Sequence, residues 1–392
     1  MPTKSPASVA IPAISSSPTK PARLLSLDAF RGLTVAGMIL VNNPGDWGYI
    51  YPPLEHAKWH GWTPTDLIFP FFLFIVGVSI TFALRAEDNG VAASRKIIKR
   101  GLTLFLLGLF LNFFPRFDPT TVRIMGVLQR IGLVYIACSF VFVNTNARQQ
   151  NWIIASLLVG YWIAMTVIPV PGVGFANLEP TTNLGAWVDR GILTGPHLWK
   201  TAKVWDPEGL FSTIPAIATG LLGVRVGGWL RRTNYTTAEK LAGLFTAGVL
   251  TTLAGLVWDG FFPINKALWT SSYVLLAGGL AMIFLATSYQ LIDVWGGVAT
   301  RRRAWTTPFV AYGVNAITVF FLSGLIPRVM NMIKLPQPDG TELGSREVLY
   351  QAGFAPYFAD PRNASLAGAV TFVVIWGIIL WFMYRNEVII KV

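Results

Sequence analysis

The chain has 392 residues, of which 53% are hydrophobic and only 13% are charged, and its formal net charge is +12. Soluble domains carry roughly 25% charged residues. This composition, with a mean hydropathy of +0.53, therefore excludes a soluble globular protein and indicates a chain whose solvent is largely lipid. The basic residues form short clusters between apolar segments, and such clusters set the orientation of membrane proteins. This arrangement accounts for the positive net charge and excludes a nucleic-acid partner. The single cysteine, Cys138, excludes an intrachain disulfide and a cysteine-based metal cluster.

Residues 1–22 are rich in Ser, Pro and Ala and lack the apolar core of a signal peptide. We expect a disordered cytoplasmic tail there, followed by one polytopic membrane domain over residues 23–392. A helix needs roughly 20 apolar residues to cross a bilayer. The segments of this kind are 27–43, 65–85, 97–114, 124–143, 151–169, 210–230, 240–258, 268–288, 305–327 and 366–384. The sequence therefore predicts an all-α integral membrane protein of about ten transmembrane helices.

The distribution of Lys and Arg predicts how these helices are oriented. With the N-terminus in the cytoplasm, 18 of the 31 basic residues fall on the cytoplasmic side and 11 on the opposite side. Much of the second group lies in long loops, which weigh less in the positive-inside rule. We therefore expect both termini in the cytoplasm and a location in the bacterial inner membrane. The long outer segments 44–64, 170–209 and 328–365 either hold a polar ligand or only link helices.

Polar side chains inside predicted spans are costly and are therefore candidates for function. Asp28 and Arg31 are three residues apart, so they share a helix face and can pair. Arg130 lies roughly two turns into the fourth predicted helix and needs a carboxylate, a carbonyl or an anionic ligand, a structural partner being favoured. Asn315 falls in the middle of the ninth predicted helix, where it is expected to join helices by hydrogen bonds. Close helix packing, compatible with a homodimer, is predicted by the glycines at 220, 223, 227, 228, 278 and 279.

The densest polar cluster joins the first two predicted helices on the outer side, over residues 41–70. Its polar members are Asn42, Asn43, Asp46, Glu55, His56, His60 and Asp66. Two histidines among acids and amides can transfer protons near neutral pH. The His-x3-His spacing also suits a metal, but Gly61 and Pro64 place it in a loop, so no metal is expected. Thr63 is a candidate N-cap for the second helix, and the aromatic residues are typical of an interfacial belt.

Two stretches of the chain carry a family resemblance: SLDAFRGLTVAGMILVNN at 26–43 and LEHAKWHGWTPTDLIFPFFLFIVGVSI at 54–80. They resemble the heparan-α-glucosaminide N-acetyltransferase family, which comprises the lysosomal enzyme and its bacterial relatives. RKIIKRG at 95–101 and GVLQRIG at 126–132 also look like the family. The resemblance is dense over residues 26–140 and weaker beyond, where the order of helices still agrees. It implies a transmembrane acyltransferase-like bundle.

The resemblance implies acetyl transfer across the membrane, with acetyl-CoA as cytoplasmic donor and a glucosamine-type amino sugar as periplasmic acceptor. The family's catalytic histidine, in its H-A-x-W motif, matches His56. The asparagine that closes the family's first helix matches Asn42, and the aspartate that opens the second matches Asp66. No role follows for His60. The turn between Asn43 and His56 is longer than in the lysosomal enzyme, which leaves the identity of the acceptor open.

These residues suit the chemistry of acyl transfer. A neutral imidazole at His56 can take a proton from the attacking amine, or it can carry the acetyl group first, and both routes stay open. Asp66 or Glu55 would orient the imidazole, and the amides of Asn42 and Asn43 can donate to the developing oxyanion. The expected contacts of the acceptor are Asn43, Glu55 and Trp59.

The cytoplasmic basic clusters offer cations for the CoA phosphates. The expected cofactor-binding residues are Arg95, Lys99, Arg100, Arg301 and Arg302. The positive-inside rule accounts for the same residues without any ligand. The competing class is a multi-pass carrier for a sugar or a cell-wall fragment, which inverted repeats and helices broken at the midplane would favour. A membrane partner for an assembly, the third class, would not depend on His56.

Overall fold

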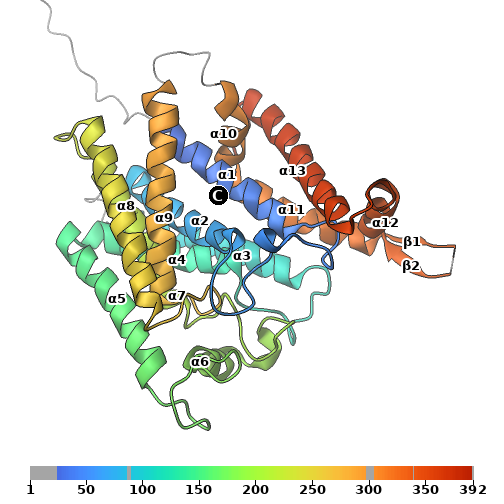
Figure 1. The fold of residues 1–392 in the computed structure, drawn as a ribbon, viewed down its shortest axis with the longest axis horizontal. Helices are drawn as coiled ribbons and strands as arrows, with labels where there is room; N and C mark the ends of the chain where they lie inside the picture. The colour runs from blue at the N-terminus through green and yellow to red at the C-terminus, as the bar shows by residue number, and fades with distance from the viewer. Residues whose placement is uncertain (1–23, 86–89, 297–303, 339, 391–392) are drawn as a thin grey trace, which may run out of the picture.

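A computed structural model describes residues 24–85, 90–296, 304–338 and 340–390, which form a bundle of helices (Figure 1). The predicted tail over residues 1–22 lies outside the described residues. The longer helices are α1 (Leu25–Asn42), α2 (Ile68–Ala83), α3 (Val91–Phe113), α4 (Val127–Asn144), α5 (Ala147–Val167), α7 (Thr213–Leu230), α8 (Thr237–Asp259), α9 (Ser271–Tyr289), α11 (Ala316–Met332) and α13 (Pro361–Arg385). The shorter elements are η2 (Pro64–Leu67), α6 (Leu184–Leu193), α10 (Thr307–Val314), α12 (Ser345–Gly353) and the antiparallel strands β1 (Lys334–Pro336) and β2 (Glu342–Gly344).

Eight of the described helices are long and apolar enough to cross a bilayer, and α10 with α11 would make a ninth span. The remaining predicted segment is α3, which is 23 residues long. Its mean hydropathy is lower because its first ten residues include Arg95, Lys96, Lys99 and Arg100. The chain is therefore a multi-pass, all-α membrane protein, as predicted. The count of ten spans and the orientation of the helices stay predictions.

The span predicted over 305–327 is not one continuous helix. α10 and α11 meet at Asn315 with a bend of 71°, because Asn315 has a φ of −109° and a ψ of 30°, outside the helical range. Its side-chain amide donates to the carbonyl oxygen of Val388, and its Oδ1 accepts from the backbone N–H of Ile390, both at 3.0 Å. The segment after α13 therefore satisfies this amide, where we had expected another helix.

Glycines allow the helices to approach closely, as predicted. Between α2 and α7, a Cβ at Gly77 would lie 1.9 Å from the carbonyl oxygen of Gly220, and a Cβ at Gly223 would lie 2.0 Å from that of Phe74. Any larger residue at these positions would push the two helices apart. No atom of the described residues lies within 4 Å of a Cβ at Gly228. Most of the glycines that suggested a homodimer thus pack helices of the same chain and give a dimer no support.

The predicted pair of Asp28 and Arg31 forms, with Arg31 Nη1 at 3.0 Å from Asp28 Oδ1. Arg31 Nη2 also donates to the hydroxyl of Ser79 at 2.7 Å, and Nη1 donates to the carbonyl oxygen of Gly313 at 3.3 Å. These contacts join α1 to α2 and α10. The Asp28–Arg31 pair therefore has a structural role, which is to hold three helices together.

The segment between α1 and α2 is fastened to the beginning of α13 and to the connection over residues 170–209. The backbone N–H of Gly45 donates to the carbonyl oxygen of Ser365 at 3.1 Å. The indole N–H of Trp59 donates to the carbonyl oxygen of Leu178 at 2.9 Å. Figure 1 shows α6 beside the lower end of α5, and α12 and the β1–β2 hairpin at the right, next to one end of α13. Several connections therefore form a cap over one end of the bundle.

Candidate active site

Within this cap, the segment that joins α1 and α2 brings His56 against Asp66. His56 Nδ1 lies 2.6 Å from Asp66 Oδ1. The side chain of Asp66 is only 1% exposed, whereas that of His56 is 50% exposed. Because an ionised carboxylate can only accept hydrogen bonds, it assigns the proton of the neutral ring to Nδ1 and leaves Nε2 as an acceptor. The pair has the geometry of a base and the acid that orients it.

Further hydrogen bonds fix the position of the Asp66 carboxylate. Its Oδ2 accepts from the backbone N–H groups of Ala57 and Thr63, both at 3.0 Å. The carbonyl oxygen of Asp66 accepts from the hydroxyl of Tyr273 on α9. η2 (Pro64–Leu67) has Thr63 as its N-cap residue and proline in its first turn, as predicted. Both the local turn and the helical bundle therefore hold the acid in place.

Only one of the two acids expected to orient His56 does so. Glu55 is exposed, and it is its carbonyl oxygen that accepts a hydrogen bond, from the hydroxyl of Thr63 at 2.6 Å. The chain then turns through Gly61, whose φ of +93° is a conformation that side chains beyond glycine rarely adopt. The N–H of Gly61 donates to the carbonyl oxygen of Ile264 at 2.8 Å. This turn shapes the loop between His56 and Asp66.

The two aromatic rings next to this pair are part of the loop's support. The Trp59 ring, whose indole N–H bonds Leu178, packs edge-on against Trp205 with centroids 5.1 Å apart. Nδ1 of His60 lies 3.4 Å from the amide nitrogen of Asn265. Trp59 therefore fastens the loop to the 170–209 connection. Its predicted contact with an acceptor stays a prediction.

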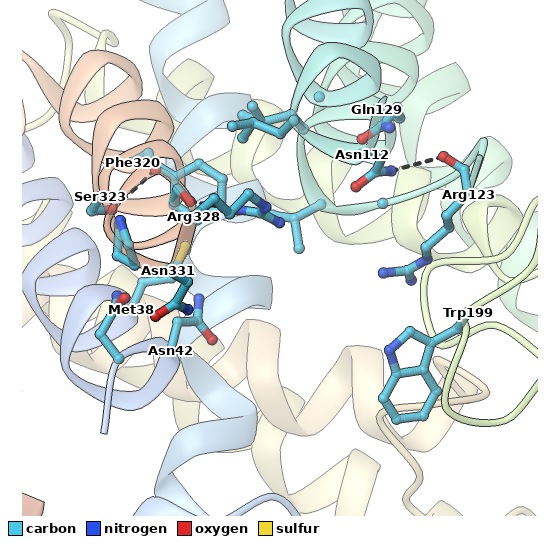
Figure 2. Close-up of a pocket in the computed structure, with 18 of the residues that line it drawn as sticks. Met38, Asn42, Asn112, Arg123, Gln129, Trp199, Phe320, Ser323, Arg328 and Asn331 are labelled. Carbon is cyan, nitrogen blue, oxygen red and sulfur yellow. Dashed lines mark hydrogen bonds between the residues drawn. The ribbon is translucent and has the colours of Figure 1, made fainter. Parts of the chain in front are cut away.

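A cavity of about 500 Å³ lies at the same end of the bundle. Figure 2 shows Asn42 and Asn331 on one wall, Arg123 and Trp199 on the opposite wall, and Arg328 between them. Asn42 and Asn43 line this cavity, but His56 and Asp66 are not among its lining residues. The amide of Asn43 also donates to the carbonyl oxygen of Ile39 at 3.0 Å, at the end of α1. The structure thus brings His56 and Asp66 together and places the two asparagines at the cavity wall.

A buried ion cluster forms one side of this cavity. Arg123 Nε donates to Asp206 at 2.8 Å, and Arg123 Nη2 donates to both Asp206 and Glu208 at 2.5 Å. Burial alone would raise the pKa of Glu208, but the positive charges of Arg123, Lys266 and Arg130 outweigh it and lower that pKa to about 2. Burial opposes the charge on Arg123, yet its bonds to the two carboxylates raise its pKa above the ordinary value. The cluster is therefore internally paired.

Arg130 lies in the first turn of α4, closer to the helix end than the predicted two turns, because α4 begins only at Val127. Its Nη2 donates to the carbonyl oxygen of Gly209 at 2.9 Å and to the hydroxyl of Ser212. The guanidinium also sits 5.0 Å above the ring of Trp269. Among the described residues, no hydrogen-bond partner reaches Nε or Nη1. The expected structural partner is thus present, as the carbonyl of Gly209 together with the hydroxyl of Ser212.

Three of the predicted cofactor residues are described, and they lie at the other end of the bundle. Arg95, Lys99 and Arg100 are exposed on the first turns of α3, and Arg100 lies 5.0 Å above the ring of Tyr135. Arg301 and Arg302 lie outside the described residues. Because these three side chains are exposed to solvent, an anion can reach them at the surface of α3.

The same end of the bundle carries a pocket that sequence reasoning missed. It has a volume of about 270 Å³ between the α4–α5 turn and the end of α7, with Arg225, Arg232 and Trp229 in its wall. Arg225 Nε donates to the Asn151 side chain at 2.8 Å, and the Arg232 guanidinium lies 5.3 Å above the Trp229 ring. Tyr235 also lies near Arg232, at 5.8 Å. The only sequence signal was a cluster of basic residues, which the positive-inside rule already explained.

A multi-pass helical bundle with a half-exposed histidine held by a buried carboxylate is a membrane protein with a candidate acyl-transfer or proton-transfer site. The family profile described as "Heparan-alpha-glucosaminide N-acetyltransferase, catalytic" matches residues 23–256. This chain belongs to that family. The match includes the whole segment that carries His56 and Asp66.

Two curated relatives extend this similarity. The heparan-alpha-glucosaminide N-acetyltransferase of Homo sapiens is 30% identical over 358 residues, which cover 76% of this chain and 52% of the relative. That of Mus musculus is 30% identical over 355 residues, covering 76% and 53%. The chain therefore spans about half the length of the curated relatives it matches.

Proposed function

We propose that this chain is a transmembrane acetyltransferase that moves the acetyl group of cytoplasmic acetyl-CoA to the amine of a glucosamine-type sugar on the periplasmic side. The observation that carries the proposal is the 2.6 Å contact between His56 Nδ1 and the buried carboxylate of Asp66. Family membership and the names of the curated relatives support the choice of acetyl group and acceptor. The enclosed acid and the half-exposed base support a role in proton transfer at a ligand.

In the direct route, His56 Nε2 takes the proton that the sugar amine loses as its nitrogen attacks the thioester carbonyl carbon. The C–N bond forms, the C–S bond breaks, and the imidazolium returns the proton to the departing sulfur. Asp66 holds the ring and stabilises the imidazolium through Nδ1. General bases of this kind contribute about 10²–10⁴ in rate.

In the covalent route, His56 Nε2 itself attacks the thioester carbon and the CoA thiolate leaves. The amine then displaces the imidazole from the acetyl group, and the ring takes up the amine proton. Asp66 orients the ring in the same way in both routes. Trapping with labelled acetyl-CoA separates them, since only the covalent route leaves label on His56.

The remaining site residues have supporting roles in this proposal. Asn42 lies at the cavity wall (Figure 2), where its amide can donate to the oxyanion or to a sugar hydroxyl. Asn43, Glu55 and Trp59 are proposed contacts of the acceptor. Glu55 is next to His56 in the chain and is exposed, so a ligand at the imidazole can reach it.

The donor would bind with its phosphates at the end of the bundle that is predicted to face the cytoplasm. Arg95, Lys99 and Arg100 are exposed there, and we propose Arg301 and Arg302 for the same role. Arg225 and Arg232 line the 270 Å³ pocket at this end. Guanidinium groups bind phosphates through paired N–H donors. Replacing Arg225 and Arg232 by Gln is expected to weaken CoA binding, more strongly at low salt than at high salt.

A carrier remains the second candidate because one specific observation favours it. The 71° break between α10 and α11 is of the kind that carriers use to bind substrates. However, the side chain at the break, Asn315, is hydrogen-bonded on both sides to Val388 and Ile390. The side chain at the break is thus already satisfied by the segment after α13.

The test is direct: incubate the purified protein with labelled acetyl-CoA and a panel of amino sugars, and measure labelled N-acetyl sugar. Transfer to at least one glucosamine-type sugar is expected. Sidedness is tested with reporter fusions, which should report cytoplasm at Arg148 and periplasm near Gly340. Transfer to none of the sugars, together with sugar uptake into proteoliposomes, would favour the carrier.

A further inference from the structure

The wall of the 500 Å³ cavity is unusually rich in positive charge. Its charged lining residues are Arg123, Arg328 and Arg346, and none of the acidic residues that the structure describes lines it. Arg123 is already paired with Asp206 and Glu208, so its charge is balanced behind the wall. Within the described part of the chain, the cavity therefore faces two further arginines and no carboxylate.

The way in which Arg328 is held leaves its guanidinium suited to a ligand. Its Nη1 donates to the carbonyl oxygen of Gly324, one turn earlier in α11, and Figure 2 shows the side chain reaching from α11 into the cavity. A guanidinium has five N–H donors in a planar fork. One bond within its own helix fixes its direction and leaves further donors for an anion.

Arg346 reaches the cavity from α12. Its Nη2 donates to the carbonyl oxygen of Pro44 at 2.8 Å, which ties α12 to the segment after α1. The neighbouring Glu347 is the acid that acts on it electrostatically, but Glu347 does not line the cavity. Burial lowers the pKa of Arg346 below its ordinary value. A bound anion beside Arg346 would stabilise its positive charge.

The rest of the wall suits a sugar ring. Amide groups of Asn42 and Asn331 and the indole rings of Trp47 and Trp199 line the same cavity. Amides bind hydroxyl groups as donors and as acceptors. The volume also falls in the range of about 300–1,000 Å³ that is usual for ligand sites.

We propose that this cavity binds an amino sugar that carries an anionic group, a carboxylate or a phosphate, and that Arg328 and Arg346 bind that group. As a statement about the acceptor, this inference rests on the proposed acetyltransferase function. As a statement about binding, it stands without transfer. The same arginines would also suit the 3′-phosphate of CoA, so the test includes a CoA fragment.

The experiment measures binding calorimetrically with the full chain in nanodiscs at low salt. The ligands are N-acetylglucosamine, N-acetylmuramic acid, N-acetylglucosamine 6-phosphate and adenosine 3′,5′-bisphosphate. We expect at least one anionic sugar to bind about tenfold or more tightly than the neutral sugar, since a charged hydrogen bond contributes about that much. Arg328→Gln should abolish this ratio and Arg328→Lys should restore part of it.

Arg116→Gln is the matched control, because Arg116 is exposed and is not among the residues lining the cavity. Equal binding of neutral and anionic sugars, or a ratio that Arg328→Gln leaves unchanged, would overturn the inference. So would a loss of affinity confined to adenosine 3′,5′-bisphosphate, which would assign the arginines to the donor.

A transfer assay with glucosamine, muramic acid and glucosamine 6-phosphate separates this inference from the proposed function. Selective binding of anionic sugars without any transfer would keep the inference and remove the acetyltransferase. Transfer to glucosamine with no anion preference in binding would keep the acetyltransferase and remove the inference.

Discussion

Two charged clusters at the same end of the bundle differ in how their charges are satisfied. In the pair of His56 and Asp66, the acid is 1% exposed and the base 50% exposed. In the cluster of Arg123, Asp206 and Glu208, the side chains are 18%, 0% and 7% exposed, and each charge has its partner.

This difference in exposure indicates that the His56–Asp66 pair takes part in the reaction, whereas the Arg123 cluster stabilises the fold. The ring nitrogen of His56 that faces away from Asp66 can exchange a proton with a ligand, because half of the side chain is open. The charges around Arg123 are compensated within the protein, and removing one would leave another buried and unpaired. The first cluster should therefore control rate, and the second should control stability.

The largest effect is expected for Asp66→Asn. An asparagine would present an N–H to His56 Nδ1 and shift the ring proton to Nε2, so the ring could not act as a base. The same change in serine proteases lowers kcat by about 10⁴, and we expect a loss of about 10²–10⁴ in transfer rate. Steady-state transfer with labelled acetyl-CoA measures it. The midpoint of thermal unfolding should stay close to that of the wild type. Normal transfer by Asp66→Asn would contradict the claim that the His56–Asp66 pair controls the rate.

Arg123→Gln should lower the stability of the protein and leave the pH profile of transfer unchanged. It leaves Asp206 and Glu208 buried without the cation that hydrogen-bonds them, and breaking a buried pair in this way typically costs about 3–5 kcal/mol. Thermal or denaturant unfolding of the purified protein should show a large loss of stability, and the protein that remains folded should retain the pH profile of transfer. A changed pH profile with unchanged stability would place Arg123 in the chemistry.

The pH dependence of stability sharpens the same contrast. The pKa of Glu208 is lowered from 4.5 to about 2 in the folded protein. Its contribution is therefore present above pH 4.5 and is lost as the pH falls toward 2, by up to about 3 kcal/mol. The difference in unfolding free energy between wild type and Glu208→Gln should shrink over this range. A difference that stays constant from pH 5 to pH 3 would contradict the pairing.

The smallest effect is expected for Gly61→Ala. The φ of +93° at Gly61 disfavours any residue with a Cβ, although no described atom lies within 4 Å of that position. The strain should cost about 1–2 kcal/mol and lower transfer severalfold by loosening the loop that carries His56. Gly160→Ala is the control, since its surroundings are equally open and it lies within α5. Equal effects of the two changes would mean that the turn does not position His56.

The sequence predicted the features that depend on local pattern. Apolar segments of sufficient length placed the helices, and the run Thr63–Asp66 predicted the turn that opens the second span. For the acid that orients His56, the sequence left Asp66 and Glu55 open, and the structure pairs His56 with Asp66. Each of these signals lies within about twenty residues of chain.

The sequence could not predict contacts between distant segments. Nothing near Arg123 in the chain points to Asp206, which is 83 residues away. The break at Asn315 depends on Val388 and Ile390, which return to it from beyond α13. The residues on both sides of the break are apolar, so the sequence pattern predicted one continuous helix over 305–327.

The central claim is tested most directly by acetyl transfer in proteoliposomes that contain wild type, His56→Ala or His60→Ala. The account predicts that His56→Ala remains folded and binds CoA but loses transfer by at least about 10²-fold. His60→Ala should stay within a few-fold of wild type, because its ring packs against Asn265 and has no contact in the His56–Asp66 pair. Near-normal transfer by His56→Ala would contradict the catalytic assignment and move the carrier to first place.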